Sequence, residues 1–220
     1  MNWICVPSPK NFSASNMTVR VEFHFDFASP NTYFCHLVIP DVEARTGVKF
    51  DYIPILLGGV FKATNNKSPM EQFAGIKNKS EYHARETQRF IEQHGIDKYQ
   101  MNPHFPVNTL HIMRGAIYAK HRDFYEEYID AIYKCMWEFG LNMSDAEVIS
   151  QALHDAGLPA AEIVEATQNP EIKKELIDNT SASVDRGAFG SPTFYVGDEI
   201  YFGKDRLREV EAEITRQTSV

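Results

Sequence analysis

The stretch Phe25-Asp26-Phe27-Ala28-Ser29-Pro30-Asn31-Thr32-Tyr33 decides the fold of this chain. Residues 19–27 alternate apolar and polar side chains, as a partly buried strand does, and residues 37–44 suit a helix. Ser29 is a favourable N-cap, and Pro30 is a favourable first helical residue because proline lacks only an N–H that would be unpaired there. We therefore expect a strand that leads directly into a helix, with Ser29 at the helix N-terminus.

The position of Ser29 at a helix N-terminus favours the binding of an anion. The unpaired N–H groups and the dipole at a helix N-terminus favour an anion. In thioredoxin-like folds the reactive cysteine of a Cys-x-x-Cys pair stands there, and the same geometry stabilises its thiolate. The four positions are Ser29-Pro30-Asn31-Thr32 in this chain, without sulfur, so the turn could stabilise the thiolate of a ligand. An ordinary helix cap at Ser29 explains this segment equally well.

Composition restricts the class of protein. The 220 residues are 43% apolar and 24% charged, which is typical of a globular protein with one or two domains. The net charge of −8 and the lack of a basic tract argue against nucleic acid or a membrane surface as a partner. Cys5, Cys35 and Cys135 are widely spaced and odd in number, which favours reduced thiols and a cytoplasmic location. The eight histidines lack metal-ligand spacing, so we expect no metal.

The order of expected elements gives the fold class. A helix over residues 30–46, ended by Gly47, and a second strand over residues 48–54 complete a βαβ unit. Residues 70–185 are helical almost throughout, with a capping box at Ser144 and Glu147 and with breaks at Gly95, residues 102–106, Gly140, residues 157–159 and residues 169–170. Residues 193–196 and 200–202 form a hairpin around Gly197-Asp198, and residues 204–216 form a last helix.

This order predicts an α/β protein with a thioredoxin-like fold (βαβ…ββα) and a large all-α insertion domain. The expected division is a disordered N-terminal extension over residues 1–16, a thioredoxin-like domain over residues 17–60 and 186–220, and an inserted helical domain over residues 61–185. Ser191-Pro192-Thr193 lies between the helical block and the hairpin, where a thioredoxin-like fold has a cis-proline beside the reactive helix. We expect a cis bond there, which leaves the main chain of Ser191 free to pair with an extended peptide.

Four blocks in order carry a resemblance to a known family. The chain resembles the glutathione-dependent 2-hydroxychromene-2-carboxylate isomerases, which are relatives of the kappa-class glutathione transferases within the DsbA-like thioredoxin superfamily. The blocks are residues 26–33 (DFASPNTY), 56–66 (LLGGVFKATNN), 187–194 (GAFGSPTF) and 201–207 (YFGKDRL). The resemblance implies a DsbA/kappa-class fold, a homodimer, glutathione as the cofactor and a small aromatic substrate.

The resemblance also implies a role for each site residue. Ser29 is the catalytic residue that keeps the glutathione sulfur as thiolate, and Ser191, before Pro192, pairs its main chain with the cysteinyl unit. The remaining residues hold the two ends of the tripeptide: Lys62 with Asn65 and Asn66 at the glycine end, and Lys204 with Asp205 at the γ-glutamyl end. A surface lysine at 62, a turn at 65–66 and the first turn of the last helix at 204–205 are the structural alternatives.

The chain departs from the family pattern at Asn31, usually an aromatic residue, at Thr32, usually Ser, and at Ser191, commonly Val. The implied reaction is reversible addition of the thiolate to the conjugated carbon of the opened chromene, rotation, and expulsion of the thiol to give trans-o-hydroxybenzylidenepyruvate, an intermediate of aromatic degradation. The alternative is a kappa-like glutathione transferase that conjugates a small electrophile. A DsbA-type oxidoreductase would need cysteines at positions 29 and 32, where this chain has Ser29 and Thr32. A peptide-binding module that catalyses no reaction is a further alternative.

Overall fold

A parallel βαβ unit opens the described part of the chain. The protein is described here by a computed structural model that covers residues 19–219. Strand β1 (Val21–Phe25) is followed by helix α1 (Pro30–Thr46), and strand β2 (Phe50–Pro54) runs parallel to β1. The Gly47 C-cap is left-handed, with φ of 72°, and its N–H donates to the Glu43 carbonyl. The expected βαβ unit is therefore confirmed.

A hairpin completes the sheet. Strand β3 (Thr193–Val196) runs antiparallel to β1, and strand β4 (Glu199–Phe202) pairs with β3, so the strand order is β2-β1-β3-β4. Gly197 makes the turn with φ of 59°, as expected of a Gly-Asp hairpin. The chain then forms a short 3-10 turn, η1 (Lys204–Arg206), and helix α10 (Leu207–Thr218). The thioredoxin-like fold predicted from the sequence is confirmed.

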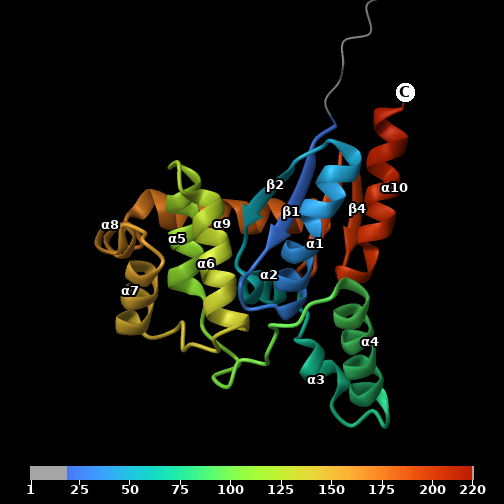
Figure 1. Ribbon diagram of the computed structural model, residues 1–220, viewed down its shortest axis with the longest axis horizontal. Helices are drawn as coiled ribbons and strands as arrows, with labels where there is room; N and C mark the ends of the chain where they lie inside the picture. Colours follow the sequence, from blue (N-terminus) through green and yellow to red (C-terminus); the bar gives the residue numbers. More distant parts are fainter. Residues whose placement is uncertain (1–18, 220) are drawn as a thin grey trace, which may run out of the picture.

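Helices fill the chain between the two halves of the sheet. In Figure 1 helices α5 to α8 gather on one side of the sheet, α9 returns toward it, and α3 and α4 extend away from it. The helices are α2 (Leu57–Thr64), α3 (Pro69–Phe73), α4 (Lys79–His94), α5 (Leu110–Lys120), α6 (Tyr125–Trp137), α7 (Ala146–Asp155), α8 (Ala160–Ala166) and α9 (Pro170–Asp185). The domain boundaries at residues 60/61 and 185/186 stay a prediction.

Two local expectations about the helices were wrong. The chain breaks between α5 and α6, at residues 121–124, where the sequence has no Gly or Pro to signal a turn. Packing fixes this end of α5 instead, because Lys120 donates to the Asp51 carboxylate at 2.5 Å and to the Tyr52 carbonyl at 2.7 Å. Helix α7 is capped by Asp145, whose carboxylate accepts two main-chain N–H groups, and not by Ser144.

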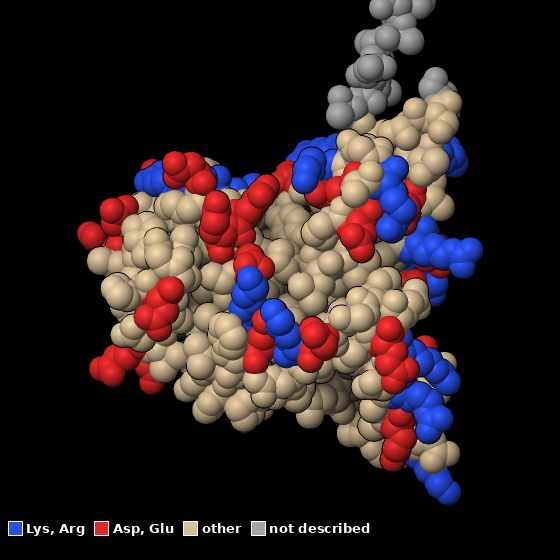
Figure 2. All heavy atoms as spheres, viewed as in Figure 1, with Lys and Arg blue, Asp and Glu red and all other residues tan. Residues whose placement is uncertain are grey.

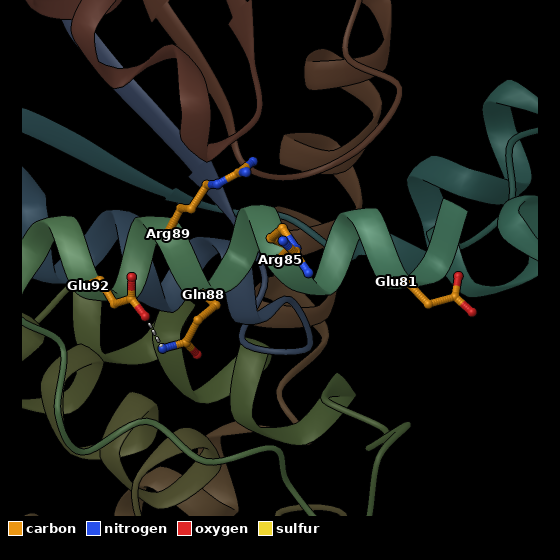
Figure 3. Close-up of a pocket in the computed structure, with 5 residues that line it drawn as sticks. All are labelled: Glu81, Arg85, Gln88, Arg89 and Glu92. Carbon is orange, nitrogen blue, oxygen red and sulfur yellow. Dashed lines mark hydrogen bonds between the residues drawn. The ribbon is translucent and has the colours of Figure 1, made fainter. Parts of the chain in front are cut away.

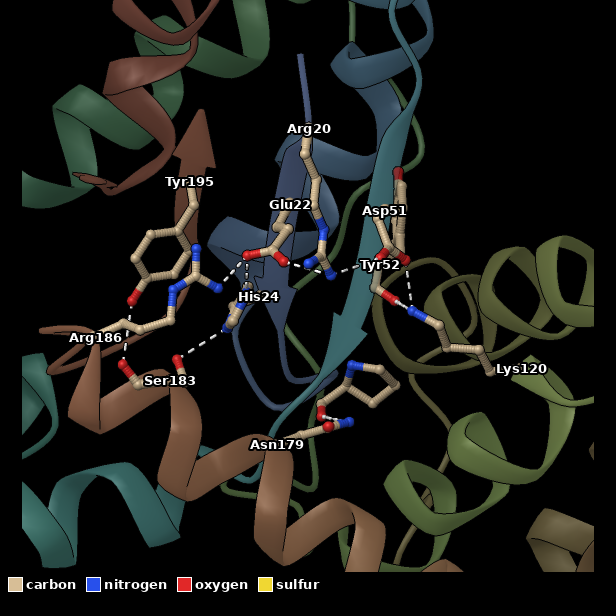
Figure 4. Close-up of polar contacts among 11 residues, drawn as sticks. Arg20, Glu22, His24, Asp51, Tyr52, Lys120, Asn179, Ser183, Arg186 and Tyr195 are labelled. Carbon is tan, nitrogen blue, oxygen red and sulfur yellow. Dashed lines mark hydrogen bonds and ion pairs between the residues drawn. The ribbon is translucent and has the colours of Figure 1, made fainter. Parts of the chain in front are cut away.

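Strand β1 is buried on both faces, which corrects the expected half-buried strand. Glu22 and His24 are each 3% exposed, because β1 lies between β2 and β3 and because α9 covers its polar face. Figure 4 shows these side chains pointing toward α9, where His24 Nδ1 lies 2.9 Å from Ser183 Oγ. Hydrogen bonds and ion pairs thus replace water on this face.

The structure also bears on the expectations about the cysteines, membrane spans and surface charge. The N-terminal extension over residues 1–16, with Cys5, lies outside the described residues. Cys35 and Cys135 are both buried and unpaired by disulfides. Within residues 19–219 no helix has the length and apolarity needed to cross a membrane. Figure 2 shows acidic and basic side chains interspersed over the face in view.

Candidate functional site

Ser29 lies between β1 and α1 and directs its hydroxyl away from the helix. The residue is extended, with φ of −97° and ψ of 119°, and its side chain makes no capping hydrogen bond. Its Oγ instead donates to the carbonyl of Ser191 at 3.3 Å. Ser29 is 7% exposed, so the hydroxyl lies just below the surface at the N-terminus of a 17-residue helix. An ordinary side-chain cap therefore does not explain this serine.

The turn that carries Ser29 is fixed by its neighbours. Thr32 is fully buried, and its hydroxyl donates to the carbonyls of Ser29 at 2.7 Å and of Asp26 at 2.8 Å. The N–H of Ser29 donates to the Asp26 carbonyl at 3.1 Å. Thr32 thus stabilises the turn and does not face a ligand, whereas Asn31 is partly exposed beside Ser29.

The loop that faces Ser29 contains the expected cis-proline. The Ser191-Pro192 peptide bond is cis, which confirms the prediction. The hydroxyl of Ser191 donates to the His24 carbonyl at 3.0 Å, and the Pro192 carbonyl accepts the N–H of Gly203 at 2.9 Å. The Ser191 carbonyl is therefore held against Ser29 by contacts with β1 and with the end of β4.

Helix α2 brings the three residues expected at the glycine end to the same region. Asn66 Nδ2 donates to the carbonyl of Phe189 at 2.7 Å, which joins the end of α2 to the loop before Pro192. Lys62 is exposed in the last turn of α2, and the exposed Asn65 ends the helix with φ of 53°. Asn66 is thus joined to the loop that leads to Ser191, while Lys62 and Asn65 are exposed on α2 and at its end.

Lys204 and Asp205 lie in η1, and only Asp205 reaches solvent. The Lys204 side chain is 3% exposed, its ammonium pairs with the Asp205 carboxylate, and it lies 4.7 Å from the centre of the Phe90 ring. The Asp205 side chain is 64% exposed. Of the two, Asp205 is the group that a ligand can contact without moving α4.

Asp26 is the site residue that sequence reasoning missed. Its side chain is buried and accepts the N–H of Ala28 at 2.9 Å, the N–H of Leu57 at 2.7 Å and the hydroxyl of Thr109 at 2.7 Å. Burial raises the pKa of this carboxyl, and the three donors only partly offset that effect. A charged residue between Phe25 and Phe27 was the available signal in the sequence.

Other features of the surface lie apart from this turn. An open pocket of about 500 Å³ lies along α4. Figure 3 shows the five side chains that line it, Glu81, Arg85, Gln88, Arg89 and Glu92. Its charges are mixed in sign, and none of the residues expected at the glutathione site lines it. Among residues 19–219 there is no group of three or more His, Cys, Asp or Glu side chains arranged to hold a metal ion.

Comparison with known proteins gives the family of this chain. A family model described as a DSBA-like thioredoxin domain matches residues 20–215. The chain belongs to this family. Within the DSBA-like thioredoxin family, its similarity is to the isomerases and kappa-class transferases named above, which confirms the resemblance seen in the sequence.

Three relatives in the family illustrate this. A 2-hydroxychromene-2-carboxylate isomerase of Sphingobium xenophagum is 28% identical over 198 residues, which cover 89% of this chain and 98% of that protein. A glutathione S-transferase kappa 1 of Rattus norvegicus is 24% identical, with 85% and 87% covered. A solved 2-hydroxychromene-2-carboxylate isomerase structure superposes with a TM-score of 0.77 at 23% identity and covers 90% of this chain and 95% of the other.

Proposed function

We propose that this protein is a glutathione-dependent 2-hydroxychromene-2-carboxylate isomerase in which Ser29 stabilises the glutathione thiolate. The observation that carries the proposal is the hydroxyl of Ser29, which lies at a helix N-terminus and donates to the Ser191 carbonyl beside a cis-proline. The names of relatives over nearly the whole chain support it. We further propose a cytoplasmic homodimer with the domain boundaries given above.

The residues present fit glutathione, because each end of a tripeptide meets a suitable group. Ser191 offers its main chain to the cysteinyl unit, and the helix N-terminus favours a nearby anion. Lys62, Asn65 and Asn66 suit the glycine carboxylate, and Asp205 suits the free amine of the γ-glutamyl end. Lys204 contributes by holding Asp205 in place.

When bound, glutathione supplies the nucleophilic sulfur that residues 29–32 lack. Ser29 then exchanges hydrogen-bond acceptors: the Ser191 carbonyl takes up a main-chain N–H of the ligand, and the Ser29 hydroxyl turns its proton toward the sulfur. A hydroxyl donor and a helix N-terminus both stabilise negative charge on that sulfur. A free thiol has a pKa of about 8.5, so this stabilisation raises the thiolate fraction at neutral pH.

The test is thermal unfolding with glutathione and with S-methylglutathione, on the wild type, on Ser29→Ala and on Ser144→Ala, a distant serine. A ligand at one hundred times its dissociation constant stabilises a protein by about 2.7 kcal/mol. We expect both ligands to raise the Tm of the wild type and of Ser144→Ala. Ser29→Ala should lose most of the response to glutathione at pH 7.5 and keep the response to S-methylglutathione, which has no thiol.

Lack of stabilisation by millimolar glutathione would exclude a glutathione site. Where the site is present, incubation with 2-hydroxychromene-2-carboxylate separates the two activities. An isomerase forms a product without glutathione, whereas a kappa-like transferase forms a product that retains it. A product that retains glutathione would contradict the isomerase proposal and support the transferase.

A further inference from the structure

Three helix N-termini converge on the buried carboxylate of Asp26. The N–H of Ala28 precedes α1, the N–H of Leu57 is the first of α2, and the hydroxyl of Thr109 belongs to the N-cap of α5. One carboxylate oxygen accepts from Ala28 and Thr109, and the other accepts from Leu57. Asp26 is 1% exposed, so the protein surrounds it completely and it cannot contact a ligand.

The contact with Leu57 has the clearest consequence for the site. Helix α2 carries Lys62 and ends at Asn65, and Asn66 follows it. The carbonyl of Asp26 also accepts the Ser29 N–H and the Thr32 hydroxyl. The same residue therefore holds the turn with Ser29 through its main chain and the start of α2 through its side chain.

We infer that Asp26 is a positioning residue that fixes α2 relative to Ser29 and so sets the spacing between the sulfur and glycine-end anchors for glutathione. This inference rests on the proposed function. All three partners of the Asp26 side chain donate to it, which matches the ionised carboxylate because that form only accepts hydrogen bonds. A hydrogen bond to a charged acceptor is stronger than one to a neutral acceptor, so the carboxylate holds the first turn of α2 more firmly than an amide would. Thr180 Oγ1 accepts the N–H of Leu56 at 2.9 Å and keeps α2 attached to α9 when the contact to Asp26 is lost.

Two variants weaken or remove the Asp26–Leu57 contact. Asp26→Asn removes the charge and turns its amide NH₂ group toward either Leu57 or Ala28, so one of these main-chain donors loses its acceptor and the other keeps a neutral one. Leu57→Pro removes the N–H itself and keeps the carboxylate. Proline is accepted at the first helical position, and Leu56 is already extended, with φ of −101° and ψ of 107°.

Matched controls separate this contact from other effects. Leu57→Ala truncates the same side chain and keeps the N–H. Thr109→Val removes the link to α5 and keeps the carboxylate with both main-chain donors. Asp145→Asn makes the same chemical change at an exposed carboxylate that caps α7, away from the site.

The experiment measures the dissociation constant of S-methylglutathione by calorimetry, together with KM for glutathione and kcat. We expect Asp26→Asn and Leu57→Pro to raise the dissociation constant and KM about tenfold, with kcat at saturating glutathione within threefold of the wild type. Leu57→Ala, Thr109→Val and Asp145→Asn should stay within twofold of the wild type in all three quantities. A merely structural role would lower kcat through loss of folded enzyme and leave KM unchanged.

A Leu57→Pro variant that binds S-methylglutathione as Leu57→Ala does would overturn the inference, even if Asp26→Asn fails to fold. A wild type that binds neither glutathione nor S-methylglutathione contradicts the proposed function instead, before any variant is compared. The two failures are therefore distinguishable.

Discussion

Tyr133 is a fully buried residue whose hydroxyl has no hydrogen-bond partner among residues 19–219. The neighbouring hydroxyl of Thr32 donates to the carbonyls of Asp26 and Ser29 and forms no hydrogen bond with the Tyr133 hydroxyl. Burial raises the pKa of the Tyr133 phenol well above its usual range, so the group stays neutral. A buried polar atom without a partner destabilises the folded state by its lost hydration.

Removing this hydroxyl should therefore not destabilise the protein. We expect Tyr133→Phe to leave the free energy of unfolding unchanged or to raise it by up to about 1 kcal/mol. Tyr128→Phe is the matched control, because that buried hydroxyl donates to the Ile112 carbonyl at 2.7 Å and its loss should cost about 1 kcal/mol. Urea unfolding of both variants measures the difference, and a Tyr133→Phe variant less stable than Tyr128→Phe would show that the Tyr133 hydroxyl has a partner.

Single residues of the site were predictable from the sequence where the signal is local. Ser29 before Pro30 and Ser191 before Pro192 stand beside residues that fix the backbone, so their places followed from short patterns. Asp26 was missed because its partners Leu57 and Thr109 lie 31 and 83 residues away. No local pattern reports a contact over that distance. Lys204 was predicted to hold the γ-glutamyl end together with Asp205, and the sequence did not signal that it is buried and packs against Phe90.

At the scale of elements, a polar network joins α9 to the sheet, as Figure 4 shows. Glu22 on β1 accepts from Arg186, which follows α9, and pairs with Arg20, and its carboxylate lies 3.3 Å from His24 Nε2. Burial alone would raise the pKa of Glu22, but the hydrogen bonds from His24 and Arg186 outweigh it and lower the pKa to about 2. Burial lowers the pKa of His24 despite the nearby Glu22, while Arg186 and Asp51 act in opposite directions.

Both shifts make the protein less stable in acid. Glu22 has a lowered pKa in the folded state, so its stabilisation is present above pH 4.5 and is lost as the pH falls toward 2. A shift of this size corresponds to roughly 3 kcal/mol. His24 also has a lowered folded pKa, so the unfolded chain takes up the proton first and stability falls as the pH drops below 6.5. The two effects therefore act in the same direction.

The Glu22→Gln variant tests this network. We expect it to be less stable than the wild type at pH 7, since Arg186 loses its ionic partner, and the difference should nearly vanish by about pH 2. Glu211→Gln is the control, because its pair with Arg45 lies at the surface, where water and salt screen the two charges. Urea unfolding at several pH values gives the comparison, and a difference that stays constant from pH 7 to pH 2 would contradict the assignment.

Elements were predictable where the chain carries its own start and stop signals. Helix α1 has Pro30 at its start and Gly47 at its end, and the hairpin has Gly197. The break between α5 and α6 and the burial of both faces of β1 depend on contacts with distant segments. Such contacts do not produce a local sequence pattern, so alternation in β1 predicted a solvated face that α9 in fact covers.

At the scale of the whole molecule, the helical segment and the sheet share one hydrophobic core. Phe27, just after β1, packs against Tyr133 of α6 with ring centres 4.8 Å apart, and its carbonyl accepts the indole N–H of Trp137 at 3.0 Å. Tyr133 also contacts Phe25 of β1. A core that continues across the boundary between two segments couples their unfolding.

We therefore expect the thioredoxin-like part and the inserted helices to unfold in one transition. Cys35 is fully buried in α1 of the thioredoxin-like part, and Trp137 is fully buried in α6 of the inserted helices, where its indole also contacts Phe27. In a Trp3→Phe, Cys5→Ser, Cys135→Ala background, we compare Trp137 emission with the reactivity of the Cys35 thiol toward a disulfide reagent. The two urea midpoints should agree within about 0.2 M, which is less than about 1 kcal/mol at the slopes of about 1–3 kcal/mol/M found for small proteins. Two separated midpoints would mean that the insertion folds as an independent unit, since a shared core requires both probes to report the same loss of packing.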